Sequence, residues 1–184
     1  MRIIAGEARG RTIDAPKGLH TRPTLDRIRE NLFNMLQGDI PGSRILDLFS
    51  GSGALSFESL SRGADFSVLV DSDRNAHQTE RNNAEKLGYS KRCRILNMDW
   101  QAAVRLLVRE NALFDIVFLD PPYRMLDLCD LFELLVPVIR PESLIVLEHE
   151  AGKEAAVSER FEMTRERSWG FCAVSFYQLK QEGE

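Results

Sequence analysis

The tetrapeptide Asp120-Pro121-Pro122-Tyr123 brings together residue types that could act on an amino group. Its two prolines fix the backbone and lack an N–H, so the groups left to point outward are acceptors: the Asp120 carboxylate and the Pro121 carbonyl. Two acceptors can hold both protons of an exocyclic NH2 group and aim its lone pair at an electrophilic carbon. Tyr123 adds a flat face on which an extruded base can stack. A rigid strand end with a surface tyrosine is the alternative interpretation.

A second stretch, residues 45–53, reads Ile-Leu-Asp-Leu-Phe-Ser-Gly-Ser-Gly and predicts a buried strand that turns sharply into a helix. Gly51 and Gly53 permit a tight turn and close approach of the backbone to a ligand, where a Cβ would obstruct. The following helix would direct free N–H groups at that ligand. We therefore expect Asp47, Phe49, Gly51 and Gly53 to bind a cofactor. The alternative interpretation is a strand–turn–helix with two glycines that binds no ligand.

Two ligand classes suit such a turn. A dinucleotide site requires G-x-G-x-x-G, and the third position here is Ser56, so that motif is incomplete. The other ligand is S-adenosylmethionine, because Asp-Leu-Phe-Ser-Gly-Ser-Gly resembles the first motif of Rossmann-like methyltransferases. Asp71, 20 positions beyond Gly51, could accept both ribose hydroxyls. Asp99 has two interpretations that can hold together: the N-cap of a helix, or an acceptor for an adenine amino group.

Apolar runs alternate with helical patterns along the chain, which predicts an α/β fold with a mostly parallel sheet and helices on both faces. A terminal hairpin suits the seven-stranded sheet of Rossmann-like methyltransferases, whose last strand is antiparallel. The polar run 74–83 indicates a largely solvated helix in which Ala76, Ala84 and Leu87 face inward. Strands are expected at 45–48, 66–71, 94–98, 113–119 and 143–148, helices between Thr24 and Gly38 and at 54–60, 74–87, 100–108 and 128–135, and the hairpin at 161–179.

The composition is that of an ordinary globular protein: 184 residues, 43% hydrophobic and 28% charged, which predicts one domain over residues 1–184. No apolar run approaches the length of a membrane span, so we expect no membrane contact. The three cysteines and three histidines are scattered, without a C-x-x-C pair or a metal-ligand cluster. Reduced thiols, a cytoplasmic location and no metal site are the expectations that follow.

The net charge of −4 argues against a uniformly basic nucleic-acid binder, but the charge is unevenly distributed. Residues 1–29 hold seven basic residues against three acidic ones, so the remainder of the chain is more acidic than the total indicates. We expect residues 1–40 to form an N-terminal arm and helix that face RNA, with residues 41–184 as the catalytic core. Arg9, Arg11, Arg22 and Arg27 are the candidate phosphate contacts. A solvated arm with no partner is the alternative.

The glycine turn, the acid at 71 and the tetrapeptide at 120 resemble, in order and spacing, methyltransferases that use S-adenosylmethionine to modify amino groups. The N-terminal segment is similar to that of the RsmD family, which methylates N2 of one guanine in small-subunit (16S) ribosomal RNA. The similarity lies in Met1–Gly6, Arg9-Gly10-Arg11, Arg22-Pro23-Thr24, Asp26-Arg27, Arg29-Glu30 and Leu32-Phe33-Asn34.

The resemblance implies a cofactor turn at Asp47, Gly51 and Gly53, a ribose acid at Asp71 and a catalytic motif at Asp120–Tyr123. Asp stands at position 71, where Glu is also common in the family. A matching role for Asp99 is the weakest part of the comparison. The implied partner is 16S ribosomal RNA in an assembling small subunit, and we expect a monomeric enzyme.

Other functions share parts of this pattern. A DNA adenine-N6 methyltransferase, or another enzyme that methylates amino groups of nucleic acids, would use the same pair of acceptors. No separate target-recognition domain is evident in 184 residues, which argues against the DNA enzyme. A nucleotide-binding module without catalysis and a dinucleotide-dependent oxidoreductase are further alternatives. The missing third glycine and the proline-rich acceptor turn argue against both.

Overall fold

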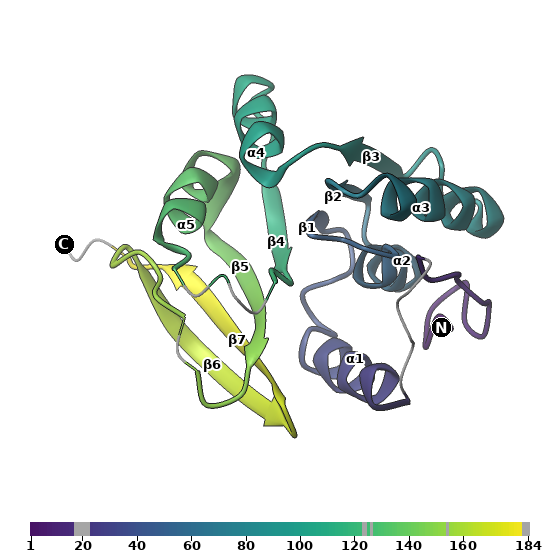
Figure 1. Ribbon diagram of the computed structural model, residues 1–184, viewed down its shortest axis with the longest axis horizontal. Coiled ribbons are helices and arrows are strands. Elements are labelled where there is room, and N and C mark those ends of the chain that lie inside the picture. Colours follow the sequence, from purple (N-terminus) through teal and green to yellow (C-terminus); the bar gives the residue numbers. More distant parts are fainter. Residues whose placement is uncertain (17–22, 123–124, 126, 154, 182–184) are drawn as a thin grey trace.

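The computed structural model describes residues 1–16, 23–122, 125, 127–153 and 155–181, and gives only the backbone of residues 23–25 (Figure 1). The strands are β1 (Arg44–Leu48), β2 (Phe66–Asp71), β3 (Cys93–Asn97), β4 (Phe114–Leu119), β5 (Ile139–Glu150), β6 (Phe161–Trp169) and β7 (Cys172–Leu179). The helices are α1 (Pro23–Met35), α2 (Ala54–Ser61), α3 (Arg74–Leu87), α4 (Trp100–Arg109) and α5 (Cys129–Leu135), and a 3-10 turn, η1 (Val136–Val138), follows α5.

The strands form one sheet in the order β3-β2-β1-β4-β5-β7-β6. Strands β1 to β5 run parallel to their neighbours within this group, whereas β7 is antiparallel to β5 and β6. The predicted seven-stranded, mostly parallel sheet with an antiparallel C-terminal strand is therefore confirmed. The order in which strands are added reverses between β1 and β4, and open α/β sheets bind ligands at the carboxyl ends of strands at such a point.

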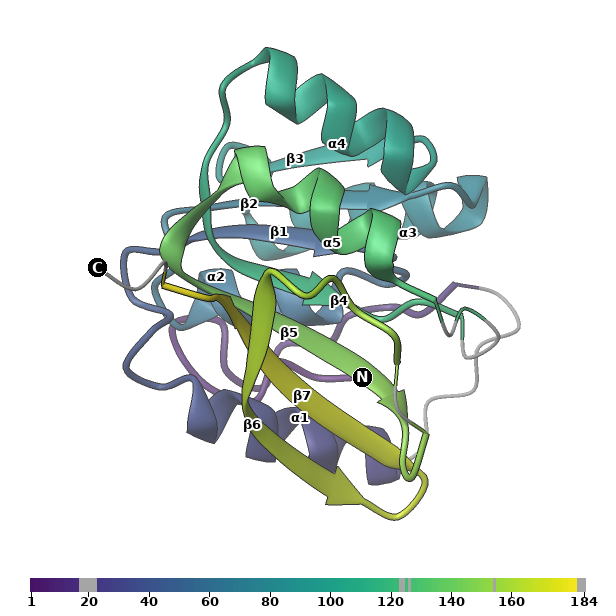
Figure 2. The same ribbon diagram turned by 90° about the vertical axis from the view of Figure 1, so that its left-hand side faces the viewer.

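Helices cover both faces of the sheet, with α1, α2 and α3 on one face and α4 and α5 on the other (Figures 1 and 2). Successive strand residues alternate between the faces. In β4, Ile116 and Phe118 pack with α1–α3, whereas Val117 and Leu119 pack with α4 and α5. We call the first side the α1–α3 face. No helix among the described residues is long and apolar enough to cross a membrane.

Local capping chemistry explains where the helices begin and end. The Asp73 side chain accepts a hydrogen bond from the Asn75 N–H at 2.7 Å at the start of α3, and Gly88 ends this helix with a φ of 81°. Asp99 caps α4 by accepting from the Ala102 N–H at 2.9 Å. Helix α1 begins at Pro23, one residue before the expected boundary at Thr24, because proline is well suited to a first helical turn.

The N-terminal arm, residues 1–16, is docked on the α1–α3 face, so it is not a free solvated segment. Ile3 and Ile13 are buried in the same core as the helices of that face. The buried carboxylate of Glu58 in α2 accepts from the Ile4 and Ala5 N–H groups at 2.7 and 3.0 Å. The Asn83 side chain in α3 both accepts from the Asp14 N–H and donates to the Asp14 carbonyl.

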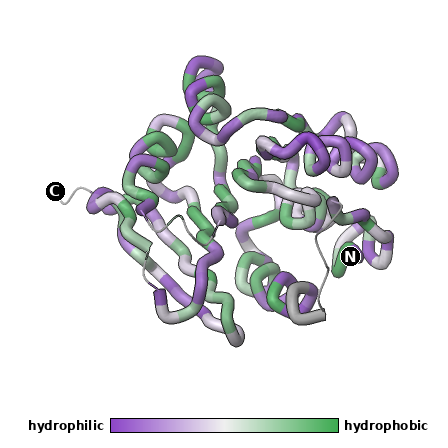
Figure 3. The backbone as a smooth tube through the Cα atoms, viewed as in Figure 1, coloured by the Kyte–Doolittle hydropathy of each residue, from purple (hydrophilic) through white to green (hydrophobic). Residues whose placement is uncertain are grey.

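Helix α3 differs from its prediction in one respect. Figure 3 shows it as mostly hydrophilic, which agrees with the polar run in its sequence. Two of the polar side chains expected in solvent, Glu80 and Asn83, are nevertheless fully buried. They are buried because they hydrogen-bond the β1–α2 turn and the N-terminal arm, which lie far away in sequence.

Candidate active site

Four acidic residues lie at the carboxyl ends of neighbouring strands and share one face of the sheet. Asp47, Asp71 and Glu148 each follow, by two positions, a strand residue that packs on the α1–α3 face. Asp120 follows Phe118 of β4 in the same way. Because alternate residues of a strand share a face, the fold brings these four carboxylates together at the switch point.

A pocket of about 200 Å³ opens at this edge. Asp47, Asp120 and Glu148 line it together with the β1–α2 turn. The opposite wall, from the N-terminal arm and α1, is mainly apolar and consists of Met1, Ala15, Pro16, Ile28, Arg29 and Leu32. Two acids and the glycine turn predicted to act at this site therefore border one cavity.

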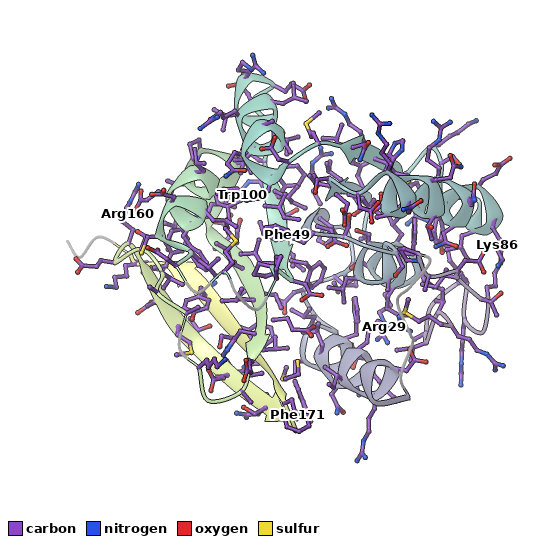
Figure 4. The ribbon with its side chains drawn as sticks, viewed as in Figure 1. Arg29, Phe49, Lys86, Trp100, Arg160 and Phe171 are labelled. Carbon is purple, nitrogen blue, oxygen red and sulfur yellow. The ribbon has the colours of Figure 1, made fainter. Side chains whose placement is uncertain are left out.

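The β1–α2 turn has a left-handed backbone at Phe49, Gly51 and Gly53, with φ of 67°, 57° and 75°. A Cβ on Gly53 would lie 2.4 Å from the Phe57 ring and 2.7 Å from Leu69, so glycine is required there. Phe49 adopts this conformation without being a glycine, which is a strained state typical of functional sites. Figure 4 shows Phe49 near the ends of β1 and β4, and it lines the pocket.

Asp47 is buried beneath the N-terminus of α2. One of its carboxylate oxygens accepts from the Ser56 hydroxyl at 2.7 Å and from the Ser56 N–H at 3.2 Å. Burial raises the pKa of Asp47 to about 7, the Ser56 hydrogen bonds oppose that rise, and the charge of Asp71 adds to it. Ser56, which makes the dinucleotide motif incomplete, is thus the residue that holds Asp47 in place.

Asp71 fastens the glycine turn to the end of β2. Its carboxylate accepts from the Gly51 N–H at 2.9 Å and from the Asp73 N–H at 2.8 Å. One oxygen serves each donor, and a carboxylate has further lone pairs, so both oxygens can accept additional hydrogen bonds. The acid 20 positions beyond Gly51 therefore contacts the turn directly, although the pocket described above is lined by other residues.

Glu80 in α3 forms a hydrogen bond to the β1–α2 turn and was not among the site residues predicted from the sequence. The Ser50 hydroxyl donates to its Oε1 at 2.5 Å, while Oε2 is buried with no partner among the described residues. Burial raises the pKa of Glu80 to about 8; the Ser50 hydrogen bond lowers it, and the charges of Asp47 and Asp71 raise it further. The sequence signal for its burial was the helical spacing that places Glu80 on the same face as Asn83 and Leu87.

Asp120 and Glu148 are neighbours across β4 and β5. Leu119 pairs with Leu147 in the parallel register, and each acid is the next residue on its strand. The Asp120 side chain is accessible to solvent at the pocket. Partial desolvation by the surrounding protein raises its pKa, and the charges of Glu148 and Asp47 raise it further. Burial also raises the pKa of Glu148. Pro121 is buried and Pro122 is exposed, and the Pro122 carbonyl accepts from the Met125 N–H at 2.8 Å.

The remaining predicted site residues lie elsewhere or are not described. Asp99 is exposed and caps α4, outside the lining of the pocket. Arg9 and Arg27 are exposed on the arm and on α1. Arg11 donates to the Lys86 and Leu87 carbonyls at the end of α3, so part of its guanidinium serves the docking of the arm. Tyr123 and Arg22 lie outside the described residues.

Arg29 was matched only as part of the N-terminal segment, and the structure places it in the pocket wall. It is 5% exposed, and its guanidinium donates to the Arg2 carbonyl and to Asp26. Figure 4 shows Arg29 between α1 and the N-terminal arm. Burial lowers its pKa, while the charges of Asp26 and Glu58 oppose this shift. In the described part of the chain, no three His, Cys, Asp or Glu side chains are arranged to hold a metal.

The sheet order, the antiparallel β7 and the acidic pocket at the switch point define a class I methyltransferase fold, with its Rossmann-like sheet. The structure described as "Putative methyltransferase yhhF from Escherichia coli" superposes with a TM-score of 0.83 and 35% identity, over 99% of both chains. The "putative methyltransferase complexed with SAH" named SMU.776 shares this fold with a TM-score of 0.71 and 16% identity, over 86% of this chain and 50% of that one.

The family described as "Conserved hypothetical protein 95" matches residues 1–178. "Ribosomal RNA small subunit methyltransferase D" of Escherichia coli (strain K12) is 36% identical over 187 residues, covering 100% of this chain and 92% of that protein. The chain belongs to the RsmD family.

Proposed function

We propose that the protein transfers a methyl group from S-adenosylmethionine to the exocyclic N2 of a guanine in small-subunit (16S) ribosomal RNA. The observation that carries the proposal is that Asp120 lines the glycine-turn pocket at the switch point, with Pro121 next to it in the chain. Membership of the RsmD family supports ribosomal RNA as the substrate class. The choice of guanine N2 comes from the family resemblance together with the acceptor-rich motif.

The pocket suits S-adenosylmethionine in its charge and its backbone. This cofactor supplies a methyl carbon made electrophilic by a positively charged sulfur. Burial raises the pKa values of Asp47 and Glu148, so a cationic ligand beside these two carboxyl groups relieves an unfavourable arrangement of charges. The turn at Gly51 and Gly53 would hold the cofactor beside Asp47 and Phe49, and the free lone pairs of Asp71 would accept its ribose hydroxyls.

The residues of the chain would then position the target amine. The Asp120 carboxylate and the Pro121 carbonyl hold the two N2 protons, which keeps the lone pair directed at the methyl carbon. Most of the contribution is orientation and electrostatics, with proton loss after the methyl group has moved. The raised pKa of Asp120 makes its carboxylate a better acceptor for that proton than an ordinary aspartate. Tyr123 would stack on the extruded base.

The N-terminal arm would position one RNA segment beside this pocket. Arg9 and Arg27 are exposed on the arm and α1, and Arg22 is a further candidate by sequence. Arg11 would contribute mainly by holding the arm against α3. An acidic protein gains little nonspecific affinity for phosphate, so the preferred substrate would be a partly assembled, protein-bearing subunit rather than naked RNA. We also propose that the enzyme is a cytoplasmic monomer.

Ligand binding and product analysis test the proposal in two steps. S-adenosylhomocysteine should raise the melting temperature of the protein, whereas NAD should not, because a ligand that binds the folded state stabilises it. Purified protein with labelled S-adenosylmethionine and small subunits should then yield N2-methylguanosine. Stabilisation by NAD alone would support the oxidoreductase alternative. N6-methyladenine formed in DNA would support the adenine methyltransferase.

A further inference from the structure

We propose that Glu148 makes the site choose guanine, by accepting a hydrogen bond from the guanine N1–H. Asp120 and Pro121 would hold the N2 amine at the same time. The inference rests on the proposed function and goes beyond it, because an Asp-Pro-Pro-Tyr turn by itself suits the amine of adenine as well as that of guanine. Glu148 would thus be the residue that determines base specificity.

The sheet register places Glu148 beside the proposed amine-binding group. Leu119 and Leu147 are partners in the parallel β4–β5 ladder, so Asp120 and Glu148 emerge side by side, with neighbouring strands about 4.8 Å apart. Both residues line the same pocket. Glu148 also borders a small hollow with Pro121 and Pro122. The acid therefore lies next to every part of the motif that the structure describes.

Glu148 has hydrogen-bonding capacity that the fold does not use. The described residues give its side chain one hydrogen-bond partner, the Cys172 thiol on β7, which is a weak donor. Asp120 across the ladder and the adjacent His149 are charged neighbours of Glu148, and Asp47 and Arg29 line the same pocket. Holding two carboxylates together at a pocket is unfavourable without a ligand, and it calls for a ligand that is rich in donors.

Guanine supplies the matching donors. Its Watson–Crick edge carries N1–H and the two N2 protons, so three donors meet three acceptors: Glu148, Asp120 and the Pro121 carbonyl. As a carboxylate, Glu148 can only accept hydrogen bonds. Adenine has a lone pair at N1 in place of the hydrogen. That lone pair would face a Glu148 oxygen, which leaves two acceptors opposed and unpaired.

The test compares two bases that share the target amine. 2-Aminopurine keeps the exocyclic N2 amine but has a lone pair at N1 and a hydrogen in place of the guanine O6, so of the three donors it lacks only the one proposed to bind Glu148. Small-subunit RNA would be ligated with guanine or 2-aminopurine at the mapped target position and reconstituted with subunit proteins. The wild-type enzyme should methylate guanine about 10- to 100-fold faster than 2-aminopurine, as expected for loss of one charged hydrogen bond.

Glu148→Gln should reduce this preference to less than about threefold, because the amide can rotate and donate to the 2-aminopurine N1. Glu142→Gln, at the exposed opposite end of β5, is the matched control and should keep the wild-type ratio. The fluorescence of 2-aminopurine reports capture of the base independently of methyl transfer. Melting temperature and S-adenosylhomocysteine affinity show that each variant is folded.

Three results would overturn the inference. An unchanged guanine preference in Glu148→Gln would show that another group recognises the base. An equal loss of rate on both bases would assign Glu148 a role in positioning or stability instead. If the wild-type enzyme methylates neither base at N2, the proposed function itself is wrong, and this inference falls with it.

Discussion

At the residue scale, the site is a group of carboxylates that the fold forces close together. Sequence motifs predicted Asp47, Asp71 and Asp120, because each ends an apolar strand beside a turn. Glu148 ends a strand in the same way but belongs to no motif, so only the register with β4 reveals its place. Tyr123 stays a prediction because it lies outside the described residues.

Asp120→Ala should separate chemistry from cofactor binding. The change removes one of two acceptors for the target amine, so turnover should fall by about 100-fold or more, in the range typical of a positioned acid or base. S-adenosylmethionine affinity, measured by calorimetry, should stay within about twofold, because the proposed contact of Asp120 is with the target base and not with the cofactor. Asp130→Ala on the exposed surface of α5 is the control. Near-normal turnover by Asp120→Ala would refute the role given to this residue.

At the element scale, α2 and α3 hold the N-terminal arm and the β1–α2 turn in place, and both of these segments line the pocket. Strand and helix bounds were predictable from apolar periodicity and caps such as Asp73 and Gly88. The buried polar contacts of Glu58 and Asn83 were not predictable, because their partners in the arm lie 54 and 69 residues away in sequence. A polar helix position is buried only when such a distant partner exists.

Gly6→Ala should loosen the N-terminal arm from α2. Gly6 has a φ of 82°, and a Cβ there would lie 1.8 Å from the Ser61 carbonyl oxygen, so the backbone would have to move. Gly10→Ala is a matched control, because its φ is 81° but nothing lies within 4 Å of a Cβ. Each variant incurs the left-handed backbone strain of about 1–2 kcal/mol. The free energy of unfolding should fall further in Gly6→Ala than in Gly10→Ala, because only the first also has the steric clash. Equal losses in denaturant unfolding would contradict the docked arm.

Glu80→Gln should change how stability depends on pH. The folded pKa of Glu80, about 8, lies above its ordinary value, so its favourable contribution is present below pH 4.5 and is lost as pH rises toward 8. The glutamine variant cannot ionise, so its free energy of unfolding should decline less over that interval. The difference should reach a few kcal/mol, since one pKa unit corresponds to about 1.36 kcal/mol.

Urea unfolding at pH 5 and pH 8 measures this effect. Asp47 also has a raised pKa, of about 7, so part of the decline should remain in Glu80→Gln. Glu85→Gln, exposed on the same helix, should behave like the wild type. A wild-type protein that becomes more stable between pH 5 and 8 would contradict the buried, protonated state assigned to Glu80.

At the scale of the whole molecule, the chain combines a Rossmann-like sheet with a basic N-terminal segment. The mostly parallel sheet and the terminal hairpin were predictable from the alternation of apolar runs and helical patterns, whereas the strand order that creates the switch point comes from the structure. The docking of the arm was not predictable, because it depends on buried hydrogen bonds and on a core shared with α1–α3. The docked arm brings Met1 and Pro16 into the pocket wall, so the pocket is formed jointly by the arm, α1, the β1–α2 turn and the carboxyl ends of β4 and β5.

Arg9→Gln combined with Arg27→Gln should weaken binding to small-subunit RNA and flatten its salt dependence. Each phosphate contact to single-stranded RNA contributes about 0.7 to the slope of log K against log salt, so the pair should reduce the slope by about 1.4. Arg105→Gln combined with Arg109→Gln removes the same charge from exposed positions of α4, on the other face. Equal effects of the two pairs in filter binding would show that the arm does not guide the RNA.

Nucleoside mass spectrometry of small-subunit RNA from cells that lack this protein tests the central claim most directly. The account predicts that one N2-methylguanosine disappears and that the wild-type gene restores it, whereas the Asp120→Ala gene does not. Site mapping should place the loss at a single guanine that is unpaired during assembly, because flipping costs least there. An unchanged content of N2-methylguanosine, with loss of another modified base or of N6-methyladenine in DNA, would contradict the account.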